Sequence, residues 1–122
     1  MGAIRAARVY GRTSLPEGRR FLVERLWPRG VRRSDLELEG WLRDVAPSTG
    51  LRRWFGHDPQ KWEEFRRRYA AELDAAPQTW QPLLDAARTE PVVLMFSARD
   101  EEHNNAVALR DYLLARRESE PV

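Results

Sequence analysis

Two short polar segments carry the residue types that could bind or transform a ligand. Residues 25–30 read Arg-Leu-Trp-Pro-Arg-Gly, and residues 99–105 read Arg-Asp-Glu-Glu-His-Asn-Asn. Arginine guanidinium groups are planar donors that match the oxygens of phosphate and carboxylate groups. If the two segments meet in space, Arg25, Arg29 and Arg99 converge on one crevice. The residue types therefore predict a site for a small anionic ligand, with a phosphate as the natural candidate.

The second segment also contains an imidazole close to a carboxylate. His103 could act as a general acid or base, with Asp100 as its organiser or as the cap of the following helix. This chemistry would suit hydrolysis or group transfer on a phosphorylated or nucleotide-like substrate. Two plainer interpretations stay open. In the first, His103 is a surface or capping residue. In the second, Arg25 or Arg29 pairs with Asp100 or Glu102 in a buried ion network.

Two adjacent asparagines, Asn104 and Asn105, follow the histidine. Asparagine lowers helix propensity, and these two bring no apolar surface in return. We therefore expect their amides to make polar contacts and count both as candidate ligand-binding residues. At most one of them can face the same crevice as His103.

A third segment, residues 54–59, supplies secondary candidates. It reads Trp-Phe-Gly-His-Asp-Pro, in which Asp58 before a proline predicts a helix cap. His57 and His103 with a nearby carboxylate would be enough ligands for a divalent metal. Their spacing matches no metal signature, however, and we expect no metal. Trp27 could wall a pocket together with the tryptophan of this segment.

Strands are needed to bring these segments together. The apolar run at residues 91–96 predicts a buried strand that delivers the second polar segment into a helix. Residues 21–27 predict another strand, ended by Pro28 and Gly30, and residues 4–10 predict a third. Ligands collect where the strands of open α/β sheets end. We therefore predict a small α/β domain with a mainly parallel sheet of about three or more strands flanked by helices.

Capping residues and apolar spacing predict the helices. In the clearest one, Trp62, Phe65, Tyr69 and Leu73 form a single apolar stripe. The other expected helix starts are Asp35, Thr49 after a Ser48 cap, a Thr79 cap and an Asp100 cap, the last leading to a buried line of Ala106, Leu109 and Leu113.

Composition bounds the class of protein. The chain has 122 residues, 42% hydrophobic and 33% charged, and no cysteine. These values predict one domain, at residues 1–118 with a frayed tail at residues 119–122, that works without disulfides or thiolates. No segment resembles a signal peptide or reaches the roughly 20 apolar residues that span a bilayer, so we expect a cytoplasmic protein without a membrane partner. Without a glycine-rich phosphate loop or a dinucleotide fingerprint, no cofactor is indicated, and no pattern specifies an oligomer.

Arginine dominates the basic residues, with twenty arginines against the single lysine Lys61 and a net charge of +2. High-GC codon usage is the plain explanation for this bias. The functional alternative to a small-ligand site is a non-enzymatic nucleic-acid- or protein-binding module that uses Arg66, Arg67, Arg68 and the C-terminal arginines. A charge run of this kind on a helix is more often a solvated face.

Three stretches together resemble the YeaO-like proteins, a branch of a bacterial and archaeal superfamily of unknown function. They are RLWPRG at residues 25–30, APST with LRRWFGHDP at residues 46–49 and 51–59, and ARDEEHNNA at residues 98–106. The resemblance covers nearly the entire chain. It implies a compact cytoplasmic α/β domain with a parallel-type sheet, and it brings no established activity with it.

The other branch of that superfamily is similar around the last strand and helix. It typically carries cysteines at the strand end and in the following helix, with a histidine and an arginine beside the second. The matching positions here are not cysteines: Phe96, Asn104, Asn105 and Ala106. The resemblance therefore implies no cysteine-dependent role for this chain. Arg99, Asp100 and His103 still match, which indicates a pocket in the same place.

Overall fold

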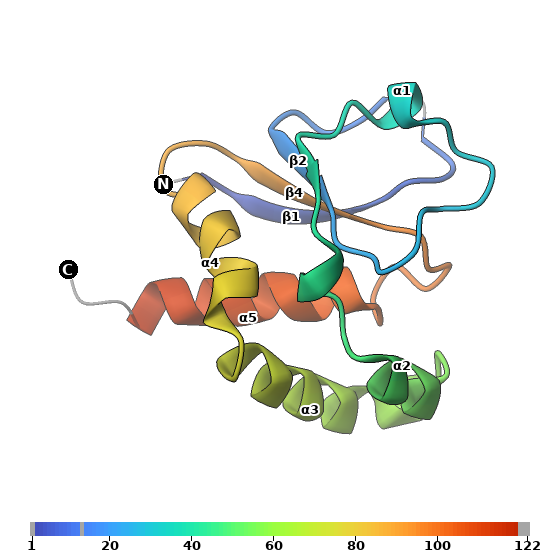
Figure 1. The fold of residues 1–122 in the computed structure, drawn as a ribbon, viewed down its shortest axis with the longest axis vertical. Coiled ribbons are helices and arrows are strands. Elements are labelled where there is room, and N and C mark those ends of the chain that lie inside the picture. The colour runs from blue at the N-terminus through green and yellow to red at the C-terminus, as the bar shows by residue number, and fades with distance from the viewer. Residues whose placement is uncertain (1, 13, 120–122) are drawn as a thin grey trace.

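A parallel β-sheet organises the protein, whose computed structural model describes residues 2–12 and 14–119. Within these residues, four strands pair in the order β1-β4-β2-β3, and all three pairings are parallel. The strands are β1 (Ile4–Arg8), β2 (Arg19–Leu22), β3 (Gly40–Trp41) and β4 (Val92–Phe96). The central strand β4 is buried at every position. This architecture, shown in Figure 1, confirms the predicted α/β class.

Helices lie mainly on one face of the sheet. They are α1 (Arg33–Leu36), α2 (Thr49–Phe55), α3 (Trp62–Asp74), α4 (Pro77–Ala86) and α5 (Asn105–Ser119), with short 3-10 turns at Arg43–Val45 and Pro59–Lys61. Helix α5 packs directly on β1 and β4, and α3 contacts both α5 and α2. The short α1 lies apart from the other helices, beyond the opposite side of the sheet (Figure 1). None of the helices in the described ranges is long and apolar enough to cross a membrane.

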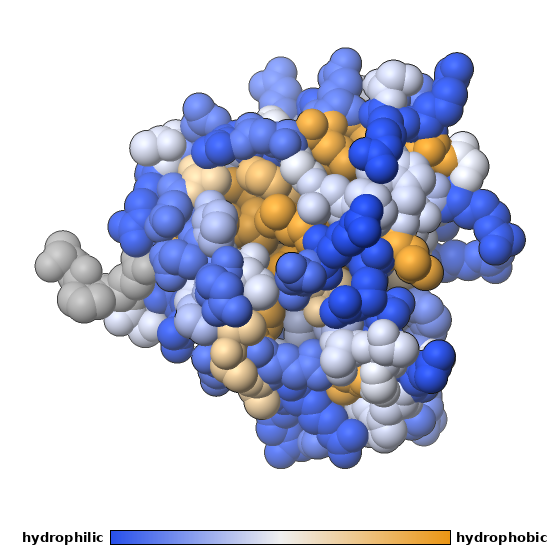
Figure 2. All heavy atoms as spheres, viewed as in Figure 1, coloured by the Kyte–Doolittle hydropathy of each residue, from blue (hydrophilic) through white to orange (hydrophobic). Residues whose placement is uncertain are grey.

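Two apolar clusters cover the two faces of β4. Val92, Leu94 and Phe96 belong to the larger cluster, which includes the buried sides of the helices. Val93 and Met95 belong to a smaller cluster that is covered by the segments around α1 rather than by long helices. Side chains alternate across a strand, so every residue of β4 contacts one of the two clusters. Hydrophilic residues cover most of the face in Figure 2, with hydrophobic areas between them.

The predicted second strand was wrong in its second half. β2 ends at Leu22 rather than at residue 27. In the part of the chain that the structure describes, one further ladder bond follows, from Val23 N to Met95 O at 3.2 Å. The apolar run continues beyond the edge of the sheet, where Leu26 is 71% exposed. The first strand also ends earlier than predicted, at Arg8. The helix expected to start at Asp35 does not continue to residue 40, because Gly40 lies in the edge strand β3.

Local capping signals predicted two helix starts correctly. The Ser48 side chain accepts a hydrogen bond from Leu51 N at the start of α2, and Gly56 ends that helix with φ 56°. Asp58 accepts a hydrogen bond from Gln60 N at the turn that leads into α3. On α3 the predicted stripe is buried at Phe65, Tyr69 and Leu73, while Trp62 is half-buried.

Three other helix starts were misplaced. Helix α1 begins at Arg33 without a side-chain cap, rather than at Asp35. Helix α4 begins at Pro77, and the Thr79 hydroxyl donates back to Ala76 O. Helix α5 begins at Asn105, five residues after the expected Asp100 cap, and continues to Ser119. Residues 120–122, the rest of the predicted frayed tail, lie outside the described residues.

Candidate functional site

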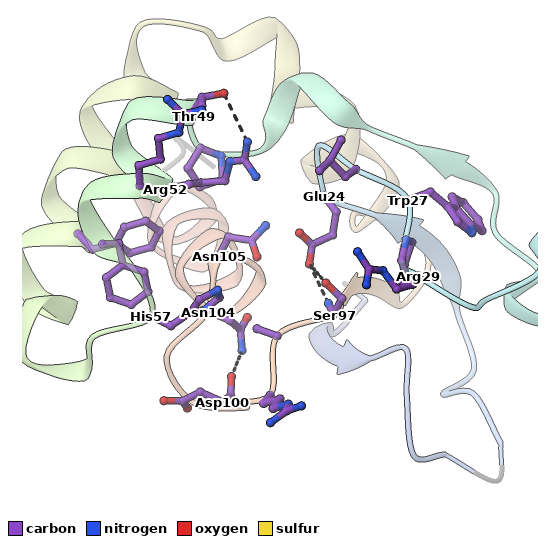
Figure 3. A pocket seen from close by; sticks show the side chains of 18 of the residues that line it. Glu24, Trp27, Arg29, Thr49, Arg52, His57, Ser97, Asp100, Asn104 and Asn105 are labelled. Atoms are coloured by element: carbon purple, nitrogen blue, oxygen red, sulfur yellow. Dashed lines mark hydrogen bonds between the residues drawn. The ribbon is translucent and has the colours of Figure 1, made fainter.

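A pocket of about 920 Å³ lies at the carboxyl ends of β2 and β4. Its wall combines residues 24 and 26–29 after β2, residues 97–100, 104 and 105 from the end of β4 to the first residue of α5, and residues of α2 with the turn that follows it. Figure 3 shows side chains from these segments facing a common space. Carboxyl edges of parallel strands are where ligands bind in open α/β folds. Two of the three polar segments found in the sequence meet here, together with part of the third.

Glu24 lines this pocket, although the sequence reasoning did not select it. Its Oε1 accepts hydrogen bonds from Ser97 N at 2.7 Å and from Ser97 Oγ at 3.1 Å. Burial raises the pKa of Glu24 above the ordinary glutamate value, while these hydrogen bonds and the charges of Arg52 and His57 act in the opposite direction. This carboxyl group therefore ties the segment after β2 to the end of β4 and pulls the chain away from the strand ladder.

Four arginines line the pocket: Arg29, Arg52, Arg53 and Arg99. None of the four makes a salt bridge with another described residue. Arg52 Nη2 lies 3.4 Å from Thr49 Oγ1, and Arg52 Nε is buried without a hydrogen-bond partner. The guanidinium donors of the pocket are therefore not occupied by carboxylates within residues 2–12 and 14–119.

Arg25, a predicted anion binder, is not part of the pocket wall. Its Nη2 lies 3.5 Å from both Ala46 O and Pro47 O, so the side chain supports the loop that precedes α2. Its Nε is buried and has no hydrogen-bond partner. Across the described residues, no salt bridge joins Arg25 or Arg29 to Asp100 or Glu102, so the alternative of a buried ion network is absent there.

His103 and Asp100 form a local pair at the turn before α5. Asp100 Oδ1 accepts from Glu102 N and His103 N, each at 2.9 Å, and Oδ2 lies 2.9 Å from His103 Nδ1. The Glu102 backbone bond, followed by the contacts with His103, lowers the pKa of Asp100. The His103 ring packs edge-on against Trp62 at 5.2 Å and is not among the pocket-lining residues. The imidazole is thus placed against α3, whereas Asp100 reaches the pocket wall.

The two asparagines line the pocket, but their amide groups form hydrogen bonds that stabilise the fold. Asn104 is 2% exposed, its Oδ1 accepts from Val107 N at 3.0 Å, and its Nδ2 donates to Asp100 O at 2.9 Å. Asn104 therefore caps α5, the role that the sequence assigned to Asp100. Asn105 Nδ2 donates to Val23 O at 2.7 Å, which links the start of α5 to the end of β2.

The secondary candidates divide between the pocket and its surroundings. His57 lines the pocket and has a positive φ of 58°. Asp58 only caps the following turn. Trp27 reaches the pocket wall, but its Nε1 donates to Val31 O and its ring contacts Trp41 at 5.4 Å, in the smaller apolar cluster. No group of three His, Asp or Glu side chains suited to a metal ion occurs among the residues described.

The residues that the sequence reasoning missed carried weak signals. Glu24 is a charged residue within an apolar run, which is unusual for a buried strand. Ser97 is the first polar residue after β4. Arg52 stands on a short helix with an arginine neighbour, and its direction could not be known before that helix was placed against the sheet.

Fold and site together define a small parallel α/β domain with an arginine-lined pocket at the carboxyl edge of its sheet. The chain belongs to the family described as "Inactive DUF488-N3 subclade" (DUF488-N3i), whose profile matches residues 3–121. This membership confirms the resemblance recognised in the sequence.

Three relatives illustrate the similarity. The chain is 39% identical over 110 residues to the uncharacterized protein YeaO of Escherichia coli K12, an alignment that covers 90% of this chain and 96% of YeaO. It is 46% identical over 70 residues to the uncharacterized proteins Mb3100c of Mycobacterium bovis and Rv3073c of Mycobacterium tuberculosis. Those alignments cover 57% of this chain and 59% of each relative. No solved structure matched the chain.

Proposed function

We propose that this protein binds a small phosphate-bearing anion in the pocket at the ends of β2 and β4. The observation that carries the proposal is the set of four lining arginines without salt-bridge partners among the described residues. Charged donors that are left without carboxylates near a cavity are well suited to an anionic ligand, because Arg–phosphate contacts are strong and directional. The positive end of the α5 dipole lies at the same edge and favours negative charge there.

Binding without turnover fits the family better than a hydrolase or transferase does. The family is described as inactive, and the imidazole that was the best acid or base candidate packs on Trp62 outside the pocket. The donors that remain for a ligand are Arg29, Arg52 and Arg99, and these arginines can bind an anion without taking part in a reaction. The pocket therefore supports recognition of a ligand more directly than chemistry on it.

The nucleic-acid alternative has weaker support. Arg67 and Arg68 both pair with Glu64, and Arg66 lies near Glu63 and Asp111. Exposed pairs such as these offset the charge that a phosphate backbone would need. The arginine run on α3 is therefore best explained as a solvated, self-compensated helix face.

Isothermal titration calorimetry with inorganic phosphate and pyrophosphate tests the proposal at low salt. Arg29→Gln and Arg52→Gln should each weaken binding by about tenfold or more, because a charged hydrogen bond contributes about 1.5–3 kcal/mol. Arg67→Gln is the matched control, since its guanidinium pairs on the exposed face of α3. Absence of any anion binding by the folded wild type, or equal losses in the control, would refute the proposed function.

A further inference from the structure

We propose that the pocket selects phosphorylated sugars over other phosphate esters, because Glu24 and Asn105 present acceptor atoms to which no described residue donates and which the hydroxyl groups of a sugar can satisfy. This inference rests on the proposed function and adds the chemical class of the ligand. It concerns the part of the ligand that the arginines do not hold.

The first acceptor is Glu24 Oε2. Both hydrogen bonds from Ser97 go to Oε1, and no described residue donates to Oε2. A carboxylate oxygen can accept two hydrogen bonds, so Oε2 has its full capacity left. Figure 3 shows the Glu24 carboxylate on the inner side of the pocket, opposite α2. A ligand donor would also offset the cost of burial that raises the pKa of this group.

The second acceptor is Asn105 Oδ1. Its Nδ2 donates to the backbone carbonyl of Val23 at 2.7 Å, and a carbonyl partner fixes which end of the amide is the donor. The Oδ1 atom is therefore the end that remains, and no described residue donates to it. Asn105 and Glu24 both line the same pocket (Figure 3). Because Asn105 bonds to the carbonyl of Val23, the residue before Glu24, the two acceptors lie in one wall, where the hydroxyl groups of a sugar can donate to them.

Bare phosphate does not satisfy this arrangement. At neutral pH it offers mostly acceptor oxygens, which suit Arg29 and Arg52 but give no donor to the free acceptor atoms of Glu24 and Asn105. A sugar phosphate separates the two functions: its phosphate contacts the arginines, and its hydroxyls donate to the acceptors. The volume of about 920 Å³ also suits an organic ligand, and Phe55 and the exposed Leu26, which both line the pocket, supply apolar surface for it.

The experiment compares four probes by calorimetry on the intact wild-type chain: inorganic phosphate, ethyl phosphate, ribose 5-phosphate and adenosine 5′-monophosphate. Ribose 5-phosphate should bind about tenfold or more tightly than ethyl phosphate, which has the same phosphate but no hydroxyls. Tighter binding of the nucleotide than of ribose 5-phosphate identifies nucleotides as the source of the sugar phosphate. The reverse order identifies free sugar phosphates. Either order supports the proposal.

A Glu24→Gln variant separates this inference from the proposed function. Glutamine keeps the side-chain shape but removes the charge, so the preference for ribose 5-phosphate over ethyl phosphate should fall several-fold while inorganic phosphate binds as well as before or better. Equal affinities of wild type for ethyl phosphate and ribose 5-phosphate would overturn the sugar selectivity and leave anion binding in place. Loss of binding for all four probes would overturn both. The wild-type comparison needs no variant, so poor folding of Glu24→Gln leaves the test valid.

Discussion

Replacing Asn104 with alanine should destabilise the protein because this side chain holds the start of α5 in place. Its Oδ1 accepts from Val107 N and its Nδ2 donates to Asp100 O. At 2% exposure the side chain leaves no room for water to take over either bond while the fold stays closed. Alanine therefore removes a helix cap and a turn-stabilising bond together.

The size of the effect follows from the two bonds. Loss of an N-cap costs about 1 kcal/mol, within a range of about 0.5–2 kcal/mol. Loss of the second hydrogen bond adds about 0.5–1.5 kcal/mol. The sum is about 1–3.5 kcal/mol. For a domain of this length each kcal/mol shifts Tm by about 4 °C, so Tm should fall by about 4–14 °C.

Thermal unfolding followed by circular dichroism measures this shift, with urea unfolding as a second readout. Asn104→Ser is the informative control: a serine hydroxyl can still cap α5 but cannot reach Asp100 O with a donor as the amide does. Serine should therefore lose about half as much stability as alanine. An alanine variant that melts within about 2 °C of wild type but no longer binds anions would refute the structural role and restore the ligand-binding role predicted from the sequence.

Three further predictions follow from other contacts. Tyr69→Phe should lower the unfolding free energy by about 1–3 kcal/mol, because it leaves the buried Val45 carbonyl without its 2.5 Å hydrogen bond. Tyr112→Phe removes an exposed hydrogen bond to Asp74 and should lower the unfolding free energy by less, which urea unfolding of the two variants can compare. The pKa of Asp100 is lowered in the folded state, so its contribution to folding stability is present above the ordinary aspartate pKa of 3.8 and is lost as pH falls through the folded pKa. Wild type should therefore lose more stability than Asp100→Asn in this acidic range. Equal losses in the two proteins would contradict the pairing of Asp100 with His103. Burial raises the pKa of Glu24, so the contribution of this group to folding stability is fully present below its ordinary pKa of 4.5 and is lost as pH rises through the folded pKa. Glu24→Gln should therefore gain stability relative to wild type between acidic and neutral pH. A difference in Tm between the two proteins that stays constant with pH would count against this reasoning.

Short-range patterns determined much of the secondary structure. Ser48 and Asp58 cap as predicted because an N-cap needs only the backbone of the next two or three residues. The stripe through Phe65, Tyr69 and Leu73 is buried because helical periodicity places these residues on one face of α3. The continuous apolar run at Val92–Phe96 predicted the buried strand β4, because a strand that is buried on both faces has apolar residues at every position.

Partners far apart in the chain decided what the sequence could not. β2 ends at Leu22 because Glu24 leaves the ladder to bind Ser97, 73 residues later. That contact exists only once β2 and β4 lie side by side. Likewise α5 starts at Asn105 rather than at the Asp100 cap, because the Asn104 and Asn105 amides find their partners in the turn and at the end of β2.

The sequence by itself determined the α/β class, the parallel sheet and the general place of the pocket, because these depend on periodicity and on where strands end. Only the tertiary structure decided which side chains face the pocket. His103 and Arg25, selected from residue type, contact Trp62 and the loop before α2 instead of the pocket. Glu24, Ser97 and Arg52, which the sequence reasoning did not select, line the pocket together with predicted residues such as Arg29 and Arg99. The direction of a side chain at a strand end depends on the neighbouring elements packed around it, and no local pattern contains that information.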